Sequence, residues 1–114
     1  MRISAMPNPD DVQETALRRG VRSDIARAVG ESLDGMFLYG SRARGDAGAD
    51  SDWDILVMLR DEVDWPTARA ALRRVQGRMA ERFGERVSIL PLRWRDADQH
   101  GGLLANVVRE GEPL

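Results

Sequence analysis

Apolar residues recur at helical spacing most clearly between Asp64-Trp65-Pro66 and Gly84. The first group is typical of a helix start and the glycine of a helix end. The apolar positions between them share one face, which predicts a long helix packed on a core. Those positions are Ala68, Ala71, Leu72, Val75, Met79 and Phe83.

Two shorter helical patterns precede this one, and another closes the chain. Asn8-Pro9 followed by two aspartates predicts a helix start with Asn8 as the cap. We expect that helix to run to about Arg19, to be interrupted at Gly20, and to be followed by a second helix from about Ser23. A last helix is expected over residues 102–109.

Three short apolar runs have the character of buried strands: residues 36–39, 53–59 and 87–92. The loop between the first two runs is too short for a crossover helix, so these strands are expected to be antiparallel. The long helix between the second and third permits a parallel pair. The predicted fold class is therefore α/β (α+β), with a small mixed β-sheet covered by helices.

Length and composition restrict the possibilities further. With 114 residues, the chain is expected to form a single domain over 1–114, with residues 1–9 as a tail. The absence of cysteine excludes disulfides and thiolate chemistry, and it is consistent with a cytoplasmic protein. No apolar run is long enough to span a membrane. The formal net charge of −2 makes nucleic acid an unexpected main partner.

Arginine supplies all the basic side chains, and several arginines fall on the long predicted helix opposite its apolar stripe. These are Arg69, Arg73, Arg74, Arg78 and Arg82. Such a run is usually a solvated helix face. A docking surface for an acidic partner is the alternative that the sequence leaves open.

The chemically informative stretch begins where the first strand ends. Gly40 lets the backbone approach a ligand closely, and Ser41 adds a hydroxyl beside the backbone N–H groups of a short helical turn. Such a turn favours phosphate. A short, glycine-containing polar loop follows and leads to Asp52-Trp53-Asp54 at the start of the second strand.

Asp52 and Asp54 are two residues apart, so on a strand both carboxylates project from the same face, while Trp53 faces the core. Carboxylates at this spacing can share one or two Mg²⁺ ions, which prefer carboxylate and phosphate oxygens. An isolated Asp-x-Asp is more often a solvated or capping pair. Its conjunction with the Gly-Ser turn favours a site for a metal-bound nucleoside triphosphate.

Gly40-Ser41, ten residues and then Asp52-Trp53-Asp54-Ile55 resemble the signature of the polymerase-β-like nucleotidyltransferases. The fuller pattern, Gly-Ser-Arg-Ala-Arg-Gly-Asp with Ser-Asp-Trp-Asp-Ile, is most similar to the minimal nucleotidyltransferase (MNT) group. The closing segment, residues 106–114, resembles that group more weakly.

The resemblance implies a polymerase-β-like fold in which Asp52 and Asp54 hold Mg²⁺ and act as the catalytic carboxylates. It also implies that Gly40 and Ser41 contact the triphosphate. The reaction would be attack by a hydroxyl on the α-phosphate, with ATP as the expected substrate and pyrophosphate leaving. Arg42 and Arg44 are candidates for further phosphate contacts, because a guanidinium presents forked donors.

One position departs from the family pattern. A third carboxylate is expected on the next core strand, and the matching position here is Ser88. Serine cannot replace a carboxylate as a ligand for a hard cation or as a general base. Glu85, three residues earlier, would face the opposite side of a continuous strand.

Two functional hypotheses follow. In the first, the chain is a nucleotidyltransferase that transfers AMP to a hydroxyl on a partner protein. The MNT group resembles antitoxins that pair with a HEPN partner, which makes this chain the expected antitoxin of a toxin–antitoxin system. In the second, the chain is a catalytically impaired nucleotide-binding module that neutralises or scaffolds a partner by contact. The acceptor, the base preference, the metal count and the oligomeric state are left open.

Overall fold

A computed structural model describes residues 9–45, 48 and 51–114. The predicted tail and the proposed cap Asn8 lie outside the described residues, except that Pro9 is the first residue of helix α1. The helical and strand segments are α1 (Pro9–Val29), η1 (Gly30–Ser32), β1 (Leu33–Tyr39), α2 (Ser41–Arg44), β2 (Trp53–Leu59), α3 (Trp65–Phe83), β3 (Val87–Arg93), η2 (Trp94–His100), α4 (Leu103–Glu110) and β4 (Glu112–Pro113).

Helix α3 forms as its sequence predicts. The Asp64 side chain accepts a hydrogen bond from the backbone N–H of Thr67, Pro66 lies in the first turn, and Gly84 ends the helix in the left-handed conformation. The predicted interruption at Gly20 is wrong, because α1 continues through it. A Cβ at Gly20 would lie 3.1 Å from the Phe83 ring, so the glycine lets α1 pack closely on α3.

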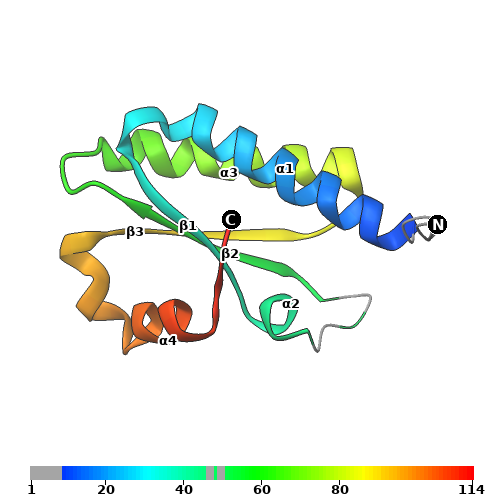
Figure 1. The fold of residues 1–114 in the computed structure, drawn as a ribbon. Coiled ribbons are helices and arrows are strands. Elements are labelled where there is room, and N and C mark those ends of the chain that lie inside the picture. Colours follow the sequence, from blue (N-terminus) through cyan, green and yellow to red (C-terminus); the bar gives the residue numbers. More distant parts are fainter. Residues whose placement is uncertain (1–8, 46–47, 49–50) are drawn as a thin grey trace, which may run out of the picture.

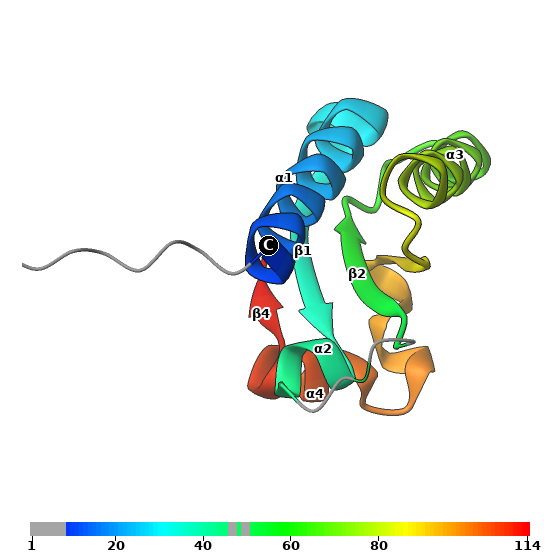
Figure 2. The ribbon, with the colours of Figure 1, turned by 90° about the vertical axis from the view of Figure 1, so that its right-hand side faces the viewer.

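The sheet is mixed and has the strand order β3-β2-β1-β4. Strands β1 and β2 are antiparallel and β2 and β3 are parallel, as the connection lengths predict. The fold class is confirmed: helices cover both faces of a four-stranded mixed sheet. Helices α1 and α3 lie side by side on one face, and α2 and α4 lie on the other (Figures 1 and 2).

Strand β2 is buried on both faces and separates two apolar clusters. Trp53, Ile55, Val57 and Leu59 face α1 and α3, whereas Leu56 and Met58 face α4. This placement explains the unbroken apolar run of β2, which an alternating, half-exposed strand would not show. It also means that Asp54, which alternates with Trp53 and Ile55, faces the α4 side.

The closing segment returns to the sheet as β4, which the sequence did not predict. Phe37 and Leu38 of β1 pair with Pro113 and Glu112. A Cβ at Gly111 would lie 2.5 Å from the carbonyl oxygen of Val107, so a larger residue does not fit where the chain leaves α4. Together these contacts fix α4 against β1, beside the strand end that carries Gly40.

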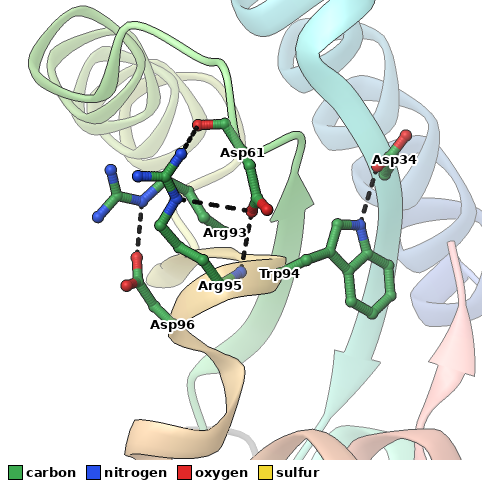
Figure 3. A network of polar contacts seen from close by, with 6 residues as sticks. All are labelled: Asp34, Asp61, Arg93, Trp94, Arg95 and Asp96. Atoms are coloured by element: carbon green, nitrogen blue, oxygen red, sulfur yellow. Dashed lines mark hydrogen bonds and ion pairs between the residues drawn. The ribbon is translucent and has the colours of Figure 1, made fainter.

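The far end of the strands, away from Asp54, is joined by a polar network (Figure 3). The indole N–H of Trp94 donates to Asp34 over 2.8 Å, and the backbone N–H of Arg95 donates to Asp61 over 2.9 Å. Arg93 donates to Asp96 over 2.6 Å. These contacts hold η2 against the ends of β1 and β2, and Trp94, the first residue of η2, is about half exposed.

Among the described helices, none combines the length and apolar character that crossing a membrane requires.

Candidate active site

One row across the sheet brings together a residue from each of three strands. Asp54 on β2 is in register with Tyr39 on β1 and with Ser88 on β3. Residues in register on adjacent strands project their side chains from the same face. The row lies on the face that α4 covers, at the end of β1 where the chain turns into α2.

Asp52 and Asp54 act on one another electrostatically. Asp52 immediately precedes β2, and Asp54 is its second residue. Burial raises the pKa of Asp54, and the neighbouring Asp52 carboxylate raises it further. Asp52 is also 3.4 Å from the exposed Arg86 guanidinium. The two carboxylates repel one another at the strand end, and a cation bound between them would relieve that repulsion.

The Gly-Ser turn lies directly against Asp54. An ideal Cβ at Gly40 would be 2.6 Å from Oδ2 of Asp54, far inside contact distance. Gly40 also has a φ of 75°, a conformation that favours glycine. The carbonyl of Gly40 accepts hydrogen bonds from the backbone N–H groups of Ala43 and Arg44, which closes the short helix α2. The motif therefore needs glycine both for its backbone conformation and for the approach of the carboxylate.

Ser41 and Arg44 lie on α2 at this same end of the sheet. Arg44 lines a cleft of about 180 Å³ between the end of β1 and α4. The other lining residues are Tyr39, Gly40, Leu103, Asn106, Val107 and Glu110. The cleft adjoins Asp54 through Gly40, although neither Asp52 nor Asp54 is among its lining residues.

Arg42 has a different environment from the other candidate residues. Its guanidinium lies 4.6 Å from the centre of the Trp53 ring, and Nη2 donates a 3.0 Å hydrogen bond to the carbonyl of Ser51. Nη2 is also 3.8 Å from Glu85. Trp53 is buried on the α1–α3 side, as predicted. Arg42 thus joins the Gly-Ser turn to the residues on either side of Asp52, and its phosphate contact stays a prediction.

The third position of the row holds no carboxylate. Ser88 is exposed and in register with Asp54. It therefore lies beside Asp54 on the next strand, where the family pattern has its third carboxylate. Glu85 lies near Arg42 instead. Within the described part of the chain, no group of three or more His, Cys, Asp or Glu side chains is placed to hold a metal ion.

The sequence reasoning missed Tyr39, Asn106 and Glu110. Burial raises the pKa of the Tyr39 hydroxyl, and the Asp54 carboxylate raises it further, so Tyr39 stays neutral beside the acid. Leu103, Asn106, Val107 and Glu110 follow helical spacing, so their common face on α4 could be read from the sequence. What the sequence lacked was the position of α4 beside Gly40.

Comparison with known protein families decides the relationship. Residues 25–114 match the family model described as polymerase beta, nucleotidyltransferase. The chain belongs to this family. The match spans the Gly-Ser turn, both aspartates and the closing segment, which confirms the resemblance drawn from the motif.

Solved structures agree with the family assignment. One assigned as a minimal nucleotidyltransferase is 29% identical, with a TM-score of 0.63 over 90% of this chain and 95% of that one. A toxin–antitoxin structure with AMP-PNP is 20% identical, with a TM-score of 0.56 over 82% of this chain and 68% of that one.

A third structure contains a tri-AMPylated HEPN toxin from Shewanella oneidensis in complex with an MNT antitoxin. It is 19% identical, with a TM-score of 0.51 over 90% of this chain and 69% of that one. At these identities, the two toxin–antitoxin structures show a shared fold. No curated protein matches the chain.

Proposed function

We propose that this chain is a metal-dependent nucleotidyltransferase that transfers AMP from ATP to a hydroxyl group on a partner protein. The observation that carries the proposal is the contact of the Gly40 turn with Asp54, beside a second carboxylate at Asp52. This contact supports a single site in which the turn would bind phosphate and the two carboxylates would bind a cation. Family membership and the AMPylated toxin in a structural neighbour support the reaction type.

Burial raises the pKa of Asp54 and the Asp52 carboxylate raises it further; the residues fit a divalent cation because a cation between them would remove that repulsion. Asp52 and Asp54 would hold Mg²⁺, the hard cation that carboxylate and phosphate oxygens suit. When bound, Mg²⁺ would neutralise negative charge on the triphosphate. Tyr39, neutral beside Asp54, completes the wall of the site next to the cleft.

In the proposed reaction, the acceptor hydroxyl oxygen bonds to the α-phosphorus of ATP. The bond from that phosphorus to the oxygen bridging the β-phosphate breaks, and pyrophosphate leaves with the bond electrons. The acceptor proton passes to solvent. Gly40 and Ser41 orient the triphosphate, Arg44 contributes a cation beside the cleft, and Arg42 contributes a phosphate contact or supports the turn from the Trp53 side.

The test is a transfer assay with α-labelled ATP, Mg²⁺ and the protein encoded by the adjacent gene, a HEPN-type protein in the proposed pairing. Label should appear on that partner and should be lost in Asp52→Asn and Asp54→Asn. Asp61→Asn, at the far end of the sheet, is the control and should keep activity. A partner that stays unlabelled with the wild-type chain would contradict transfer.

Ser88 favours a second candidate function. A site with two carboxylates and a serine in the third position could bind the nucleotide without transferring it, and the chain would then act on its partner by contact. This candidate predicts a tight complex with the unlabelled partner and an Mg²⁺-dependent rise in melting temperature with a non-hydrolysable ATP analogue.

A further inference from the structure

Helices α1 and α3 lie side by side on the opposite face of the sheet from Asp54 (Figures 1 and 2), and their side chains line a groove. Two adjoining hollows, of about 400 Å³ and 390 Å³, share Arg27 and Arg78 in their walls. Their other lining residues are Asp24, Ala28, Ala71, Arg74, Met79, Glu81 and Arg82. The groove therefore has apolar residues between rows of arginine.

The charge of these two helices differs from that of the whole molecule. Helices α1 and α3 carry nine arginines and five acidic residues, although the chain has a formal net charge of −2. The remaining parts of the protein are correspondingly acidic. A local excess of one sign on one face attracts groups of the opposite sign and orients their approach.

Asp24 fixes part of this basic surface. It is the one buried acidic residue among the described residues, with 8% exposure, and its Oδ2 is 3.0 Å from Nε of Arg78. Its Oδ1 is 4.0 Å from Arg27. Each guanidinium has five N–H donors, so a contact with one carboxylate uses only part of its capacity. Asp24 therefore orients Arg78 and contacts Arg27, which lowers the entropy that these two side chains lose on binding.

The composition of the groove distinguishes between kinds of acidic partner. Half-buried Ala28 and the largely buried Ala71 form a small apolar floor over the buried Met79, which suits the side chains of a peptide and gives nothing to a phosphate backbone. A helix with acidic residues flanking an apolar stripe matches both the floor and the arginine rows.

We propose that the α1–α3 groove docks an acidic amphipathic helix of a protein partner. Apolar side chains of that helix contact the floor, and its carboxylates pair with Arg27, Arg74 and Arg82. Because the groove and Asp54 lie on opposite sides of the sheet, docking leaves the active site open. The proposal depends neither on nucleotide nor on transfer, so it can fail or hold independently of the proposed function.

The probe is a fluorescein-labelled helical peptide with glutamates flanking a stripe of leucine and alanine, measured by fluorescence anisotropy without nucleotide or Mg²⁺. A matched peptide with glutamine in place of glutamate tests charge. The protein variants are Arg74→Glu/Arg82→Glu in the groove and Arg69→Glu/Arg73→Glu elsewhere on α3. The two pairs change the net charge equally, and each removes one arginine that lies over an aromatic ring.

We expect the groove pair to weaken peptide binding by at least about tenfold and the control pair by less than about threefold. The glutamine peptide should bind the wild-type chain about as weakly as the glutamate peptide binds the groove variant. Circular dichroism should show that both variants keep their helix content. Equal losses from the two pairs, absence of binding to the wild-type chain, or tighter binding of an RNA or DNA oligonucleotide would each overturn the proposal.

Discussion

Ser88 on β3 is in register with Asp54 on the parallel neighbour β2, with both side chains on the face that α4 covers. The serine is exposed, so nothing in the core requires a small residue there. The position is structurally ready for a carboxylate, although the sequence does not supply one. Whether two acids suffice for transfer can therefore be tested by adding the third.

Ser88→Asp is expected to increase Mg²⁺ or Mn²⁺ affinity by on the order of tenfold, because a third carboxylate joins the same row. Transfer activity should rise with it. Calorimetric titration with each metal, and the labelled-ATP assay, provide the measurements. Ser88→Asn is the matched control, since it adds a similar volume without charge. An unchanged metal affinity in Ser88→Asp would show that the row does not form the metal site.

Gly40→Ala is expected to lower the free energy of unfolding by about 1–3 kcal/mol from backbone strain at positive φ. It should also abolish transfer, because the new Cβ would overlap Oδ2 of Asp54. Denaturant unfolding and the transfer assay measure the two effects. Gly45→Ala separates them: Gly45 has a φ of 80°, and none of the described residues beyond its chain neighbours comes within 4 Å of its Cβ position. That variant should be strained yet keep more activity.

Asp54→Asn is expected to raise the melting temperature of the metal-free chain at neutral pH. Burial and Asp52 raise the folded-state pKa of Asp54, so the folded chain binds this proton more tightly than the unfolded chain does. The free energy of unfolding therefore falls as pH rises from the ordinary carboxyl pKa through the raised one. Above that window the full penalty is present, and the asparagine variant lacks it.

The check is a series of melting curves in a chelating buffer from acidic to neutral pH. The advantage of Asp54→Asn should grow with pH and disappear when the pH falls below the ordinary carboxyl range. Glu62→Gln, which neutralises an exposed acid away from the site, is the charge-matched control. Added Mg²⁺ should raise the melting temperature of the wild-type chain and leave the variant unchanged. A wild-type advantage at neutral pH without metal would contradict the sign of the shift.

Arg42→Met is expected to lower both the melting temperature and ATP-analogue affinity, because Arg42 joins the Gly-Ser turn to Ser51 across the Trp53 ring. If Arg42 only contacted phosphate, affinity would fall and the nucleotide-free melting temperature would not. Thermal shift with and without the analogue separates the two roles. Glu85→Gln, which removes a partner of Arg42 at 3.8 Å, is expected to have a smaller effect of the same kind.

The sequence predicted those elements whose local pattern agrees with their place in the folded structure. The β2 bounds follow from an apolar run that is buried on both faces, and the α3 bounds from Asp64 and Gly84. The pairing of the Gly-Ser turn with Asp54 followed from a conjunction of motifs. The contact itself depends on antiparallel pairing that places Tyr39 beside Asp54.

The features that the sequence did not predict depend on distant partners. Helix α1 continues through Gly20, where the ring of Phe83 from α3 packs closely. The residues near Gly20 in the sequence do not indicate this contact. Glu112-Pro113 has no strand pattern and becomes β4 only because β1 offers its edge. The contacts of Arg42 likewise require the loop to return to Ser51 before Trp53 can lie under the guanidinium.

Strand β3 forms one edge of the sheet, and two of its residues weaken that edge as a template for another strand. The backbone N–H of Ile89 donates to Oε1 of Gln76 on α3 over 2.7 Å, so it points away from β2. Pro91, two residues later, has no N–H to offer on that side. An edge with its donors occupied or missing resists pairing between chains.

The double variant Gln76→Ala/Pro91→Val is therefore expected to self-associate, because it restores a donor at residue 91 and releases the one at Ile89. Light scattering coupled to size-exclusion chromatography should show a larger mass that rises with concentration. Gln76→Ala alone should also destabilise the monomer by about 1 kcal/mol, since it removes one hydrogen bond to a partly buried N–H. Gln99→Ala, on η2 in a hollow that Pro91 also lines, is the control and should stay unchanged. A double variant that matches the wild-type mass at every concentration would show that other features of β3 keep the edge unpaired.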